Sequence, residues 1–358
     1  MSKVEIKVQF ETITPLWTGD AWMENNEIRP SSLIGSLRFW FEVICYFGGI
    51  CSEKDFDKEK GRFEKEISQE EFKKKLLKHG SDFRGQIEAL KELEVPIPAI
   101  IFGTTGWKSL IEINGIRYLN DYCFGNKLNL STKFCISKNE NKEVKENNEC
   151  PKRSDYDWSV FYFKIPYFYG KFEVVFKVHN QIKDSIFFPL LNFMDKYGYW
   201  GGGWNIGYGR LRINRVEIIE EVNNVKEVSD WRKDEFDFSG FGKENVYLGE
   251  NDSKENGLIN LATTKNALAR KDLKIKYWKY DKCNSDVKEV LKNLIVEKSN
   301  LRRSLNDQKE RHYIFGKTGN IQGEDLPQGS KILPYINRLD NNSYECGFLS
   351  IAGILNLY

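Results

Sequence analysis

Two hydrophobic periodicities alternate along the first 220 residues, and their order restricts the fold more than any other feature of the sequence. Residues 4–10 and 172–178 alternate apolar and polar side chains, a period of two that predicts strands with one buried face. Between them, residues 33–47 repeat apolar side chains every three or four positions, which predicts a helix packed on a sheet. Ser31 or Ser32 is expected to cap this helix.

The remaining patterns complete an α+β order. Residues 182–197 predict a second helix despite Pro189, and residues 211–219 predict a further strand. Strand, helix, strands, helix, strand is the order of a ferredoxin-like sandwich, in which helices cover one face of an antiparallel sheet. Residues 50–95, rich in Lys and Glu, predict inserted amphipathic helices, whereas residues 136–155 lack apolar periodicity and predict a mobile loop.

An internal repeat predicts a second domain of the same kind. Residues 101–106 read Ile-Phe-Gly-Thr-Thr-Gly, and residues 314–319 read Ile-Phe-Gly-Lys-Thr-Gly. Both copies follow a charged helical pattern and precede an apolar strand pattern, which favours two related domains. We therefore expect two ferredoxin-like (RRM-like) domains with antiparallel sheets, an N-terminal one at residues 1–225 and a C-terminal one at residues 226–358.

Composition and charge exclude several classes of function. The net charge of +2 gives no bulk attraction to nucleic acid or membranes, so any such surface must be a local patch. The sequence has no apolar run long enough for a bilayer and no export signal, so a cytoplasmic protein without a membrane partner is expected. Seven cysteines without a C-x-x-C pair and only three histidines disfavour zinc, and the odd cysteine count indicates reduced thiols. No cofactor is expected.

A glycine cluster at residues 201–209 is the first candidate site. Its backbone amides are free to approach a ligand such as phosphate. The cluster follows a helix, precedes a strand and lacks a Walker lysine, so a nucleotide cofactor is disfavoured, and a tight structural turn is the alternative. Aromatic and basic side chains adjoin the glycines: Trp200, Trp204, Tyr208 and Arg210. They favour a surface that stacks bases and contacts phosphates of single-stranded nucleic acid.

A basic segment is the second candidate site. Residues 261–317 contain 15 Lys and Arg against 7 Asp and Glu, a net charge of +8, and residues from about 286 to 305 within it predict a helix. Tyrosines and a tryptophan interleave with these charges, a mixture that favours an RNA path over a solvated face. His312 beside Arg311 is a further candidate, either as a phosphate contact or as an acid or base.

Four motifs resemble those of a known family. They are Thr14-Pro-Leu-Trp-Thr-Gly-Asp20, Ile28-Arg-Pro-Ser-Ser-Leu-Ile-Gly-Ser-Leu-Arg-Phe-Trp40, Phe102-Gly-Thr-Thr-Gly106 and the loop before Tyr208-Gly-Arg. The chain thereby resembles the RAMP superfamily of CRISPR effector proteins, and most closely the first-named RAMP subunit of the Cmr (type III-B) complex. That family's glycine loop usually carries several arginines, where this chain has Trp204-Asn-Ile206.

The resemblance implies a subunit of an antiviral ribonucleoprotein that binds guide (CRISPR) RNA, single-stranded target RNA or both, beside other Cmr RAMP subunits. Arg29 and Arg38 flank the start of the first helix, whose amides can also bind phosphate. For Arg29 the alternative is an ion pair with Glu24 or Glu27, and for Arg38 a surface or intersubunit contact. The expected RNA contacts are Arg29, Arg38, Trp200, Gly201, Gly202, Gly203, Trp204, Asn205, Tyr208, Arg210, Lys265, Arg270, Arg302, Arg303, Arg311, His312 and Lys317.

A catalytic role is the alternative function. In RAMP subunits that cut target RNA, the loop between the first strand and the first helix carries the aspartate that does so, and Asp20 lies in that loop here. The resembled subunit is not the cutting one, and neither clustered carboxylates nor a histidine-rich site accompanies Asp20. We therefore expect a non-catalytic RNA-binding subunit, with an endonuclease using Asp20 or His312, or a purely structural subunit, as alternatives.

Overall fold

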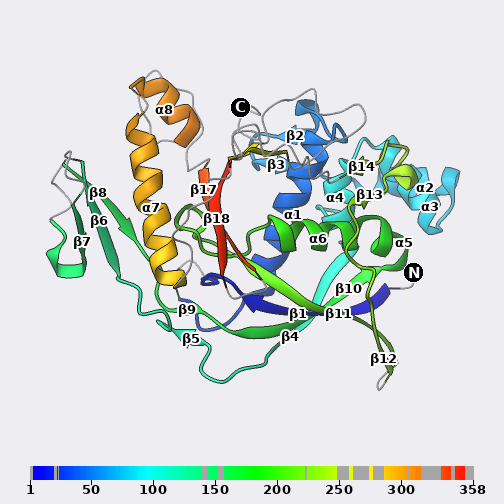
Figure 1. Ribbon diagram of the computed structural model, residues 1–358. Coiled ribbons are helices and arrows are strands. Elements are labelled where there is room, and N and C mark those ends of the chain that lie inside the picture. The colour runs from blue at the N-terminus through cyan, green and yellow to red at the C-terminus, as the bar shows by residue number, and fades with distance from the viewer. Residues whose placement is uncertain are drawn as a thin grey trace.

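The computed structural model is a mixed α/β protein built from several antiparallel sheets (Figure 1). It describes residues 3–19, 22, 24–138, 143–151, 157–221, 224–247, 258–260, 274–276, 286–304, 306–315, 332–339 and 343–350. The helices are α1 (Pro30–Phe47), α2 (Gln69–His79), α3 (Phe83–Glu92), α4 (Ile97–Phe102), α5 (Asn180–Ile182), α6 (Phe188–Lys196), α7 (Val287–Ser304) and α8 (Gln308–Phe315). Among these residues, no helix is both long enough and apolar enough to cross a bilayer.

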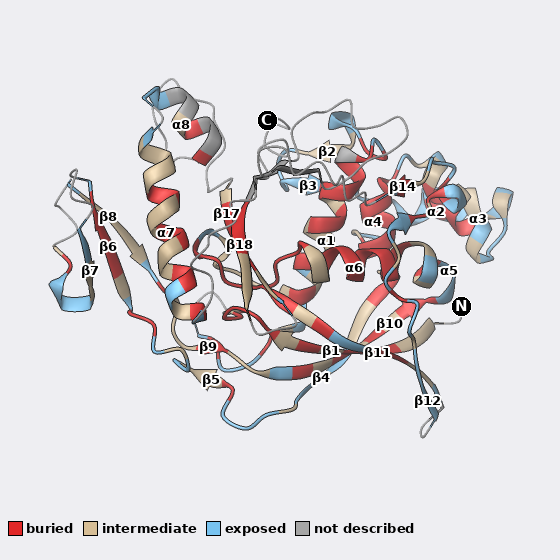
Figure 2. Ribbon diagram, viewed as in Figure 1, coloured by how far each residue is buried: buried red, intermediate tan, exposed pale blue. Residues whose placement is uncertain are grey.

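The main sheet has the strand order β12-β11-β1-β10-β4, and every neighbouring pair is antiparallel. Its strands are β1 (Lys3–Thr12), β4 (Ile111–Tyr118), β10 (Lys171–His179), β11 (Leu211–Glu221) and β12 (Asn224–Glu227). Alternate residues of β1 and β10 are buried under α1 and α6, which lie on one face of the sheet (Figures 1 and 2). In chain order the elements are β1, α1, β4, β10, α6 and β11, the order that the sequence predicts.

The first helix begins earlier than predicted and has no side-chain cap. Arg29 is the N-cap residue, Pro30 occupies the first turn, and neither Ser31 nor Ser32 caps the helix. Proline suits this position because its fixed φ matches the helix and its missing N–H has no intrahelical partner there. The second predicted helix is confirmed in three parts, α5, a π-helical turn (Lys183–Phe187) and α6, and Pro189 lies in the first turn of α6.

The predicted insertion at residues 50–95 contains α2, α3 and a two-stranded sheet of β2 (Phe56–Asp57) and β3 (Arg62–Phe63). Phe72 of α2 and Leu90 of α3 pack into the main core, whereas Leu77 is exposed. The two helices are thus amphipathic, as predicted. Two further two-stranded sheets pair β5 (Phe124–Gly125) with β9 (Tyr167–Phe168), and β13 (Glu235–Phe236) with β14 (Val246–Tyr247).

The predicted mobile loop at residues 136–155 is wrong in its described part. A three-stranded sheet in the order β7-β6-β8 forms there from β6 (Lys133–Ser137), β7 (Val144–Glu146) and β8 (Trp158–Tyr162). Cys135 of β6 forms a disulfide with Cys150, which follows β7, and this corrects the expectation of reduced thiols. The strands are only three to five residues long, so alternation could not reveal them.

The second half contains a sheet in the order β15-β16-β18-β17. Its strands are β15 (Leu258–Asn260), β16 (Lys274–Lys276), β17 (Ile332–Arg338) and β18 (Tyr344–Ser350). α7 lies between the β6–β8 sheet and β17–β18 (Figure 1), and its apolar face shares one core with both. After β14 the described elements run strand, strand, helix, helix, strand, strand, so a second ferredoxin-like domain is not confirmed and stays a prediction.

The predicted domain boundary at residue 225 also stays a prediction. Residues beyond it pack into the main core, where the rings of Phe236 and Phe238 lie 6.4 and 6.0 Å from that of Phe41 on α1. The internal repeat has a structural counterpart in its described part, because Ile-Phe ends a helix in both copies, at Phe102 of α4 and at Phe315 of α8.

Arg210 joins α6 to β17 and is completely buried. Its guanidinium donates to the carbonyl oxygens of residues 194, 195, 196 and 198 at and just after the end of α6 and, through Nε, to the carbonyl oxygen of Ile336 at 3.1 Å. It also lies over the rings of Tyr199 and Tyr335. The last carbonyl groups of a helix lack intrahelical partners, so this arginine satisfies the end of α6 and anchors it to the second sheet.

We expect Arg210→Lys to lower the free energy of unfolding by roughly 3 kcal/mol, because an ammonium keeps the charge but cannot reach several carbonyl groups through a planar fork. Urea unfolding would measure the change. The matched control is Arg215→Lys, which alters a half-exposed arginine paired with Glu217 and Glu227 and should change stability by less than about 0.5 kcal/mol. Equal unfolding midpoints for the two variants would contradict the role given to Arg210.

Candidate nucleic-acid interface

The glycine loop, residues 201–209, pairs with the segment that follows β1. The N–H of Gly202 donates to the carbonyl oxygen of Trp17 (2.7 Å), that of Gly209 donates to Pro15 (2.8 Å), and that of Gly201 donates to Ser36 Oγ (2.9 Å). Gly201 has a φ of 69°, and a Cβ there would lie 2.3 Å from the carbonyl oxygen of Trp17. The predicted structural turn is therefore the better account of these three amides, which donate inside the protein.

The predicted stacking surface is wrong for two of its three aromatic residues. Trp200 and Tyr208 are buried, with Trp200 edge-on to Phe10 and the hydroxyl of Tyr208 donating to the carbonyl oxygen of Lys164. Their rings pack in the core because the loop is bonded to α1 and to the segment that follows β1. Trp204 is half-buried against α1, and Asn205 is exposed.

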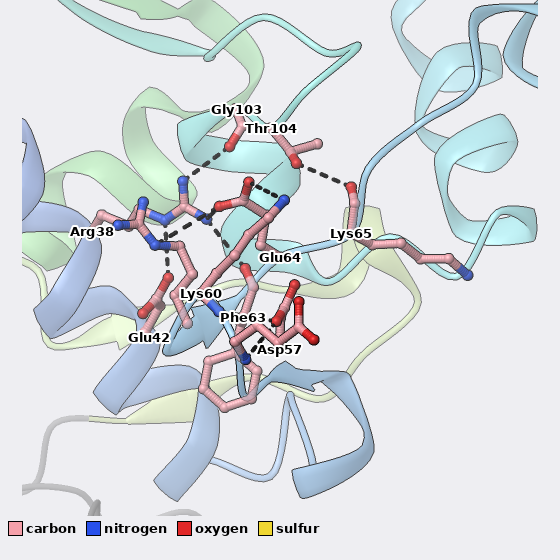
Figure 3. A network of polar contacts seen from close by, with 11 residues as sticks. Arg38, Glu42, Asp57, Lys60, Phe63, Glu64, Lys65, Gly103 and Thr104 are labelled. Atoms are coloured by element: carbon pink, nitrogen blue, oxygen red, sulfur yellow. Dashed lines mark hydrogen bonds and ion pairs between the residues drawn. The ribbon is translucent and has the colours of Figure 1, made fainter.

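Two arginines predicted to contact RNA instead form their hydrogen bonds within the protein. Arg210 is buried at the end of α6, as described above. Arg38 donates to Glu42, Glu64 and the carbonyl oxygens of Phe63 and Gly103 (Figure 3). These bonds attach β3 and the turn after α4 to α1, so Arg38 holds the insertion in place. Burial raises the pKa of Glu42 to about 7 although Arg38 opposes this shift.

Arg29 differs from Arg38 in its setting. It is the N-cap residue of α1, half-buried, and its backbone N–H donates to Thr18 Oγ1 at 3.1 Å. Pro30 and Ser31 beside it are exposed. The start of α1 therefore reaches the surface, whereas the Arg38 side chain further along the helix is only 12% exposed.

The basic segment forms a cluster of cations at the end of α7 and in α8. The α7–α8 cluster, as we name it, consists of Lys298, Arg302, Arg303 and Arg311. Arg302, Arg303 and Arg311 are half-buried, and Lys298 is 8% exposed. Burial and the neighbouring Arg311 lower the pKa of Arg302, and burial lowers that of Arg303. His312 of α8 is buried beside Arg311.

No carboxylate of the described residues forms an ion pair with any member of this cluster. Elsewhere in the same residues, arginines are paired with carboxylates within 4 Å: Arg38, Arg62, Arg117, Arg215, Arg232 and Arg338. The cluster is thus a local excess of positive charge that the described residues leave unbalanced. Such an excess attracts a polyanion.

Lys298 brings the cluster and the glycine loop together. Its Nζ donates to the carbonyl oxygen of Asn205 at 3.0 Å. Ile206 and Tyr208 of the loop pack in the same core as Leu291 and Leu294 of α7. The two candidate sites predicted from the sequence therefore meet at Asn205, whereas the predicted Arg38 and Arg210 lie apart from that surface.

Lys298 was missed by sequence reasoning, although a signal was present. It follows Val287, Leu291 and Leu294 at the spacing of the buried stripe of α7, where a lysine is unusual. Four predicted residues, Asp20, Lys265, Arg270 and Lys317, lie outside the described residues. Within the described residues no group of three or more His, Cys, Asp or Glu is placed to hold a metal ion.

The family model of the RAMP superfamily matches residues 9–212, which run from β1 through the glycine loop to the start of β11. The chain belongs to the RAMP superfamily. The α7–α8 cluster lies outside the matched residues of this RAMP protein, so the family match and the charge excess are independent observations.

No curated protein matches the chain. Two of the similar solved structures belong to Cmr proteins. One is a chain of the type III-B Cmr-beta complex bound to cognate target RNA, with 11% identity, 99% coverage of both chains and a TM-score of 0.43. The other is Cmr6 from Pyrococcus furiosus, with 14% identity, 58% coverage of this chain, 97% of that chain and a TM-score of 0.26. The assignment to the superfamily rests on the family match.

We expect Gly201→Ala to destabilise the fold by more than about 1 kcal/mol, because the new Cβ meets the Trp17 carbonyl oxygen and alanine is strained at a positive φ. The matched control is Gly35→Ala on α1, where a Cβ meets nothing within 4 Å and alanine should stabilise the helix by roughly 0.5–1 kcal/mol. Thermal unfolding of both variants tests this, and a Gly201 variant as stable as the wild type would contradict the close packing.

Proposed function

We propose that this RAMP protein is a non-catalytic RNA-binding subunit of a type III-B CRISPR (Cmr) effector ribonucleoprotein. Membership of the superfamily supports an RNA-targeting role, and the motifs around Trp17, Arg29 and the glycine loop support the Cmr subfamily. The single observation that carries RNA binding is the α7–α8 cluster, in which no cation is paired with a described carboxylate. Guide RNA and single-stranded target RNA both carry the phosphates that such a cluster would bind.

The geometry narrows the proposed contacts. Arg302, Arg303 and Arg311 contact phosphates, with the buried Lys298 and the exposed Asn205 joined by a hydrogen bond beside them. Trp200, Tyr208, Arg38 and Arg210 contribute to the fold instead, so recognition relies on the RNA backbone more than on stacking of bases. Arg29 at the start of α1 and residues Lys265, Arg270 and Lys317 remain proposed contacts.

We expect full-length protein to bind mixed-sequence single-stranded RNA, and the triple variant Arg302→Ala, Arg303→Ala, Arg311→Ala to bind it more weakly. Each phosphate contact contributes about 0.7 to the slope of log affinity against log salt for a single strand. Loss of three contacts should therefore reduce that slope by about 2. Fluorescence anisotropy across a salt series would measure affinity and slope together.

The matched control is the triple variant Arg62→Ala, Arg117→Ala, Arg215→Ala, which removes the same charge from arginines already paired with carboxylates. It should lower affinity far less than the cluster variant. RNA binding by the wild type that does not change with salt, or equal losses in the two variants with both folded, would contradict the proposed site.

Catalysis is tested separately through Asp20. We expect Asp20→Ala to leave RNA cleavage by the assembled effector complex unchanged, because the groups that position metal and activate the attacking hydroxyl would then belong to other subunits. The isolated chain with Mg²⁺ should not cleave paired target RNA. Cleavage by the isolated chain that disappears in the Asp20 variant, with RNA binding intact, would make this protein a nuclease.

Co-purification tests the proposed partners. Expression of the chain with the neighbouring effector subunits should yield a complex that retains RNA, and sequencing of that RNA distinguishes guide from target. A chain that associates with no effector subunit and retains no RNA would remove the basis of the proposal.

A further inference from the structure

Lys298 is the one member of the α7–α8 cluster that is almost wholly buried, with 8% of its surface exposed. Its Nζ has a single hydrogen-bond partner among the described residues, the carbonyl oxygen of Asn205 at 3.0 Å. An ammonium can donate three hydrogen bonds, and a buried cation is normally paired with a carboxylate. Here the neighbouring charged group, Arg302, has the same sign. The site thus disfavours the charged form of this lysine until an anion arrives.

The direction in which the pKa of Lys298 is shifted agrees with this geometry. Burial, with a smaller contribution from Arg302, lowers the pKa of Lys298 from 10.5 to about 7. In the free protein near neutral pH the side chain therefore exists as a mixture of amine and ammonium. The ammonium donates the stronger hydrogen bond to Asn205, because charge-assisted bonds are about twice as strong as neutral ones.

We propose that RNA binding at the α7–α8 cluster is coupled to the uptake of one proton by Lys298, which strengthens its bond to Asn205 and holds the glycine loop against α7. This inference rests on the proposed RNA-binding function and adds a regulatory property to the same site. Phosphates that approach Arg302 and Arg311 bring negative charge next to Lys298 and so favour its charged form. Binding and protonation then assist each other.

The charged and titratable groups around Lys298 come from three elements. Arg302 lies on α7 itself, and Arg311, which also acts on Arg302, lies on α8 with His312. The glycine loop contributes only the neutral carbonyl group of Asn205. Glu297, the adjacent carboxylate, accepts a hydrogen bond from Asn300. Among the described residues, therefore, no carboxylate neutralises Lys298 before RNA binds.

The direction in which RNA affinity changes with pH follows from the number of protons on Lys298 in the free and in the RNA-bound protein. Below pH 7 free Lys298 is largely protonated already, so binding takes up little. Above pH 7 the free side chain is largely neutral while the bound one is charged, so each binding event takes up close to one proton. Affinity for RNA should consequently fall by about fivefold from this residue alone between pH 7 and pH 8.

Isothermal titration calorimetry of the full chain with mixed-sequence single-stranded RNA tests this. Titrations at equal ionic strength in two phosphate-free buffers of different ionisation enthalpy, HEPES and Tris at pH 8 and MES and Bis-Tris at pH 6, give the number of protons taken up per RNA bound. At pH 8 we expect the wild type to take up about one proton more than Lys298→Met, and at pH 6 we expect no difference. Subtracting the variant from the wild type cancels any contribution from His312.

Lys288→Met on the same helix is the matched control and should take up as many protons as the wild type, because Lys288 is only half-buried. Lys298→Met should fold, since the lowered pKa means that the lysine reduces stability below about pH 10 and most fully below pH 7. Tight RNA binding with equal proton uptake by the wild type and Lys298→Met at pH 8 would overturn this inference alone. Absence of RNA binding at both pH values would instead overturn the proposed function.

Discussion

A buried guanidinium surrounded by carbonyl oxygens is the interaction on which the relation between the two halves of this RAMP protein depends. Moving a cation out of water costs free energy. Arg210 offsets this cost by donating hydrogen bonds to carbonyl oxygens at the end of α6 and to that of Ile336 of β17. Its backbone also bonds to the segment after β1, because its N–H donates to Thr14 Oγ1 and its carbonyl oxygen accepts from Ile13. The end of the glycine loop, the start of β11 and the second sheet are thereby positioned together, and Asn205 reaches Lys298 as a result.

Local periodicity predicted the elements of the first half well, since β1, β10 and α1 each bury one regular face. It could not predict what the polar and aromatic residues contact. Trp200 and Tyr208 stand beside glycines, a pattern equally compatible with a stacking surface and with a tightly packed loop, and only the positions of Phe10 and Lys164 decide between them. The role of Arg38 could not be predicted either, because its guanidinium donates to the carbonyl oxygen of Gly103, which is far away in sequence.

The candidate site was predicted in part for a related reason. An excess of lysine and arginine over a segment is visible in composition, so Arg302, Arg303 and Arg311 could be selected. Whether each cation is already neutralised depends on neighbours that only the fold supplies. On the exposed face of the main sheet, Lys7 pairs with Glu217 and Lys177 pairs with Glu5, and those charges offer little to a ligand. The net charge of +2 therefore conceals, within the described part of the chain, a separation between a balanced sheet surface and an unbalanced helix surface.

The position of α7 limits how the molecule can be divided. Its apolar face packs on Ile13, Tyr167 and Tyr208 from the first half and on Ile336 from the second. A fragment ending at residue 225 would expose those first-half side chains to water, and it would also lose the strand that Arg210 binds. Truncation would therefore confuse loss of a ligand contact with loss of the shared core, whereas single substitutions on the outer face of α7 keep the two effects separate. A fragment of this chain is therefore not expected to keep the structure that the same residues have in the full-length protein.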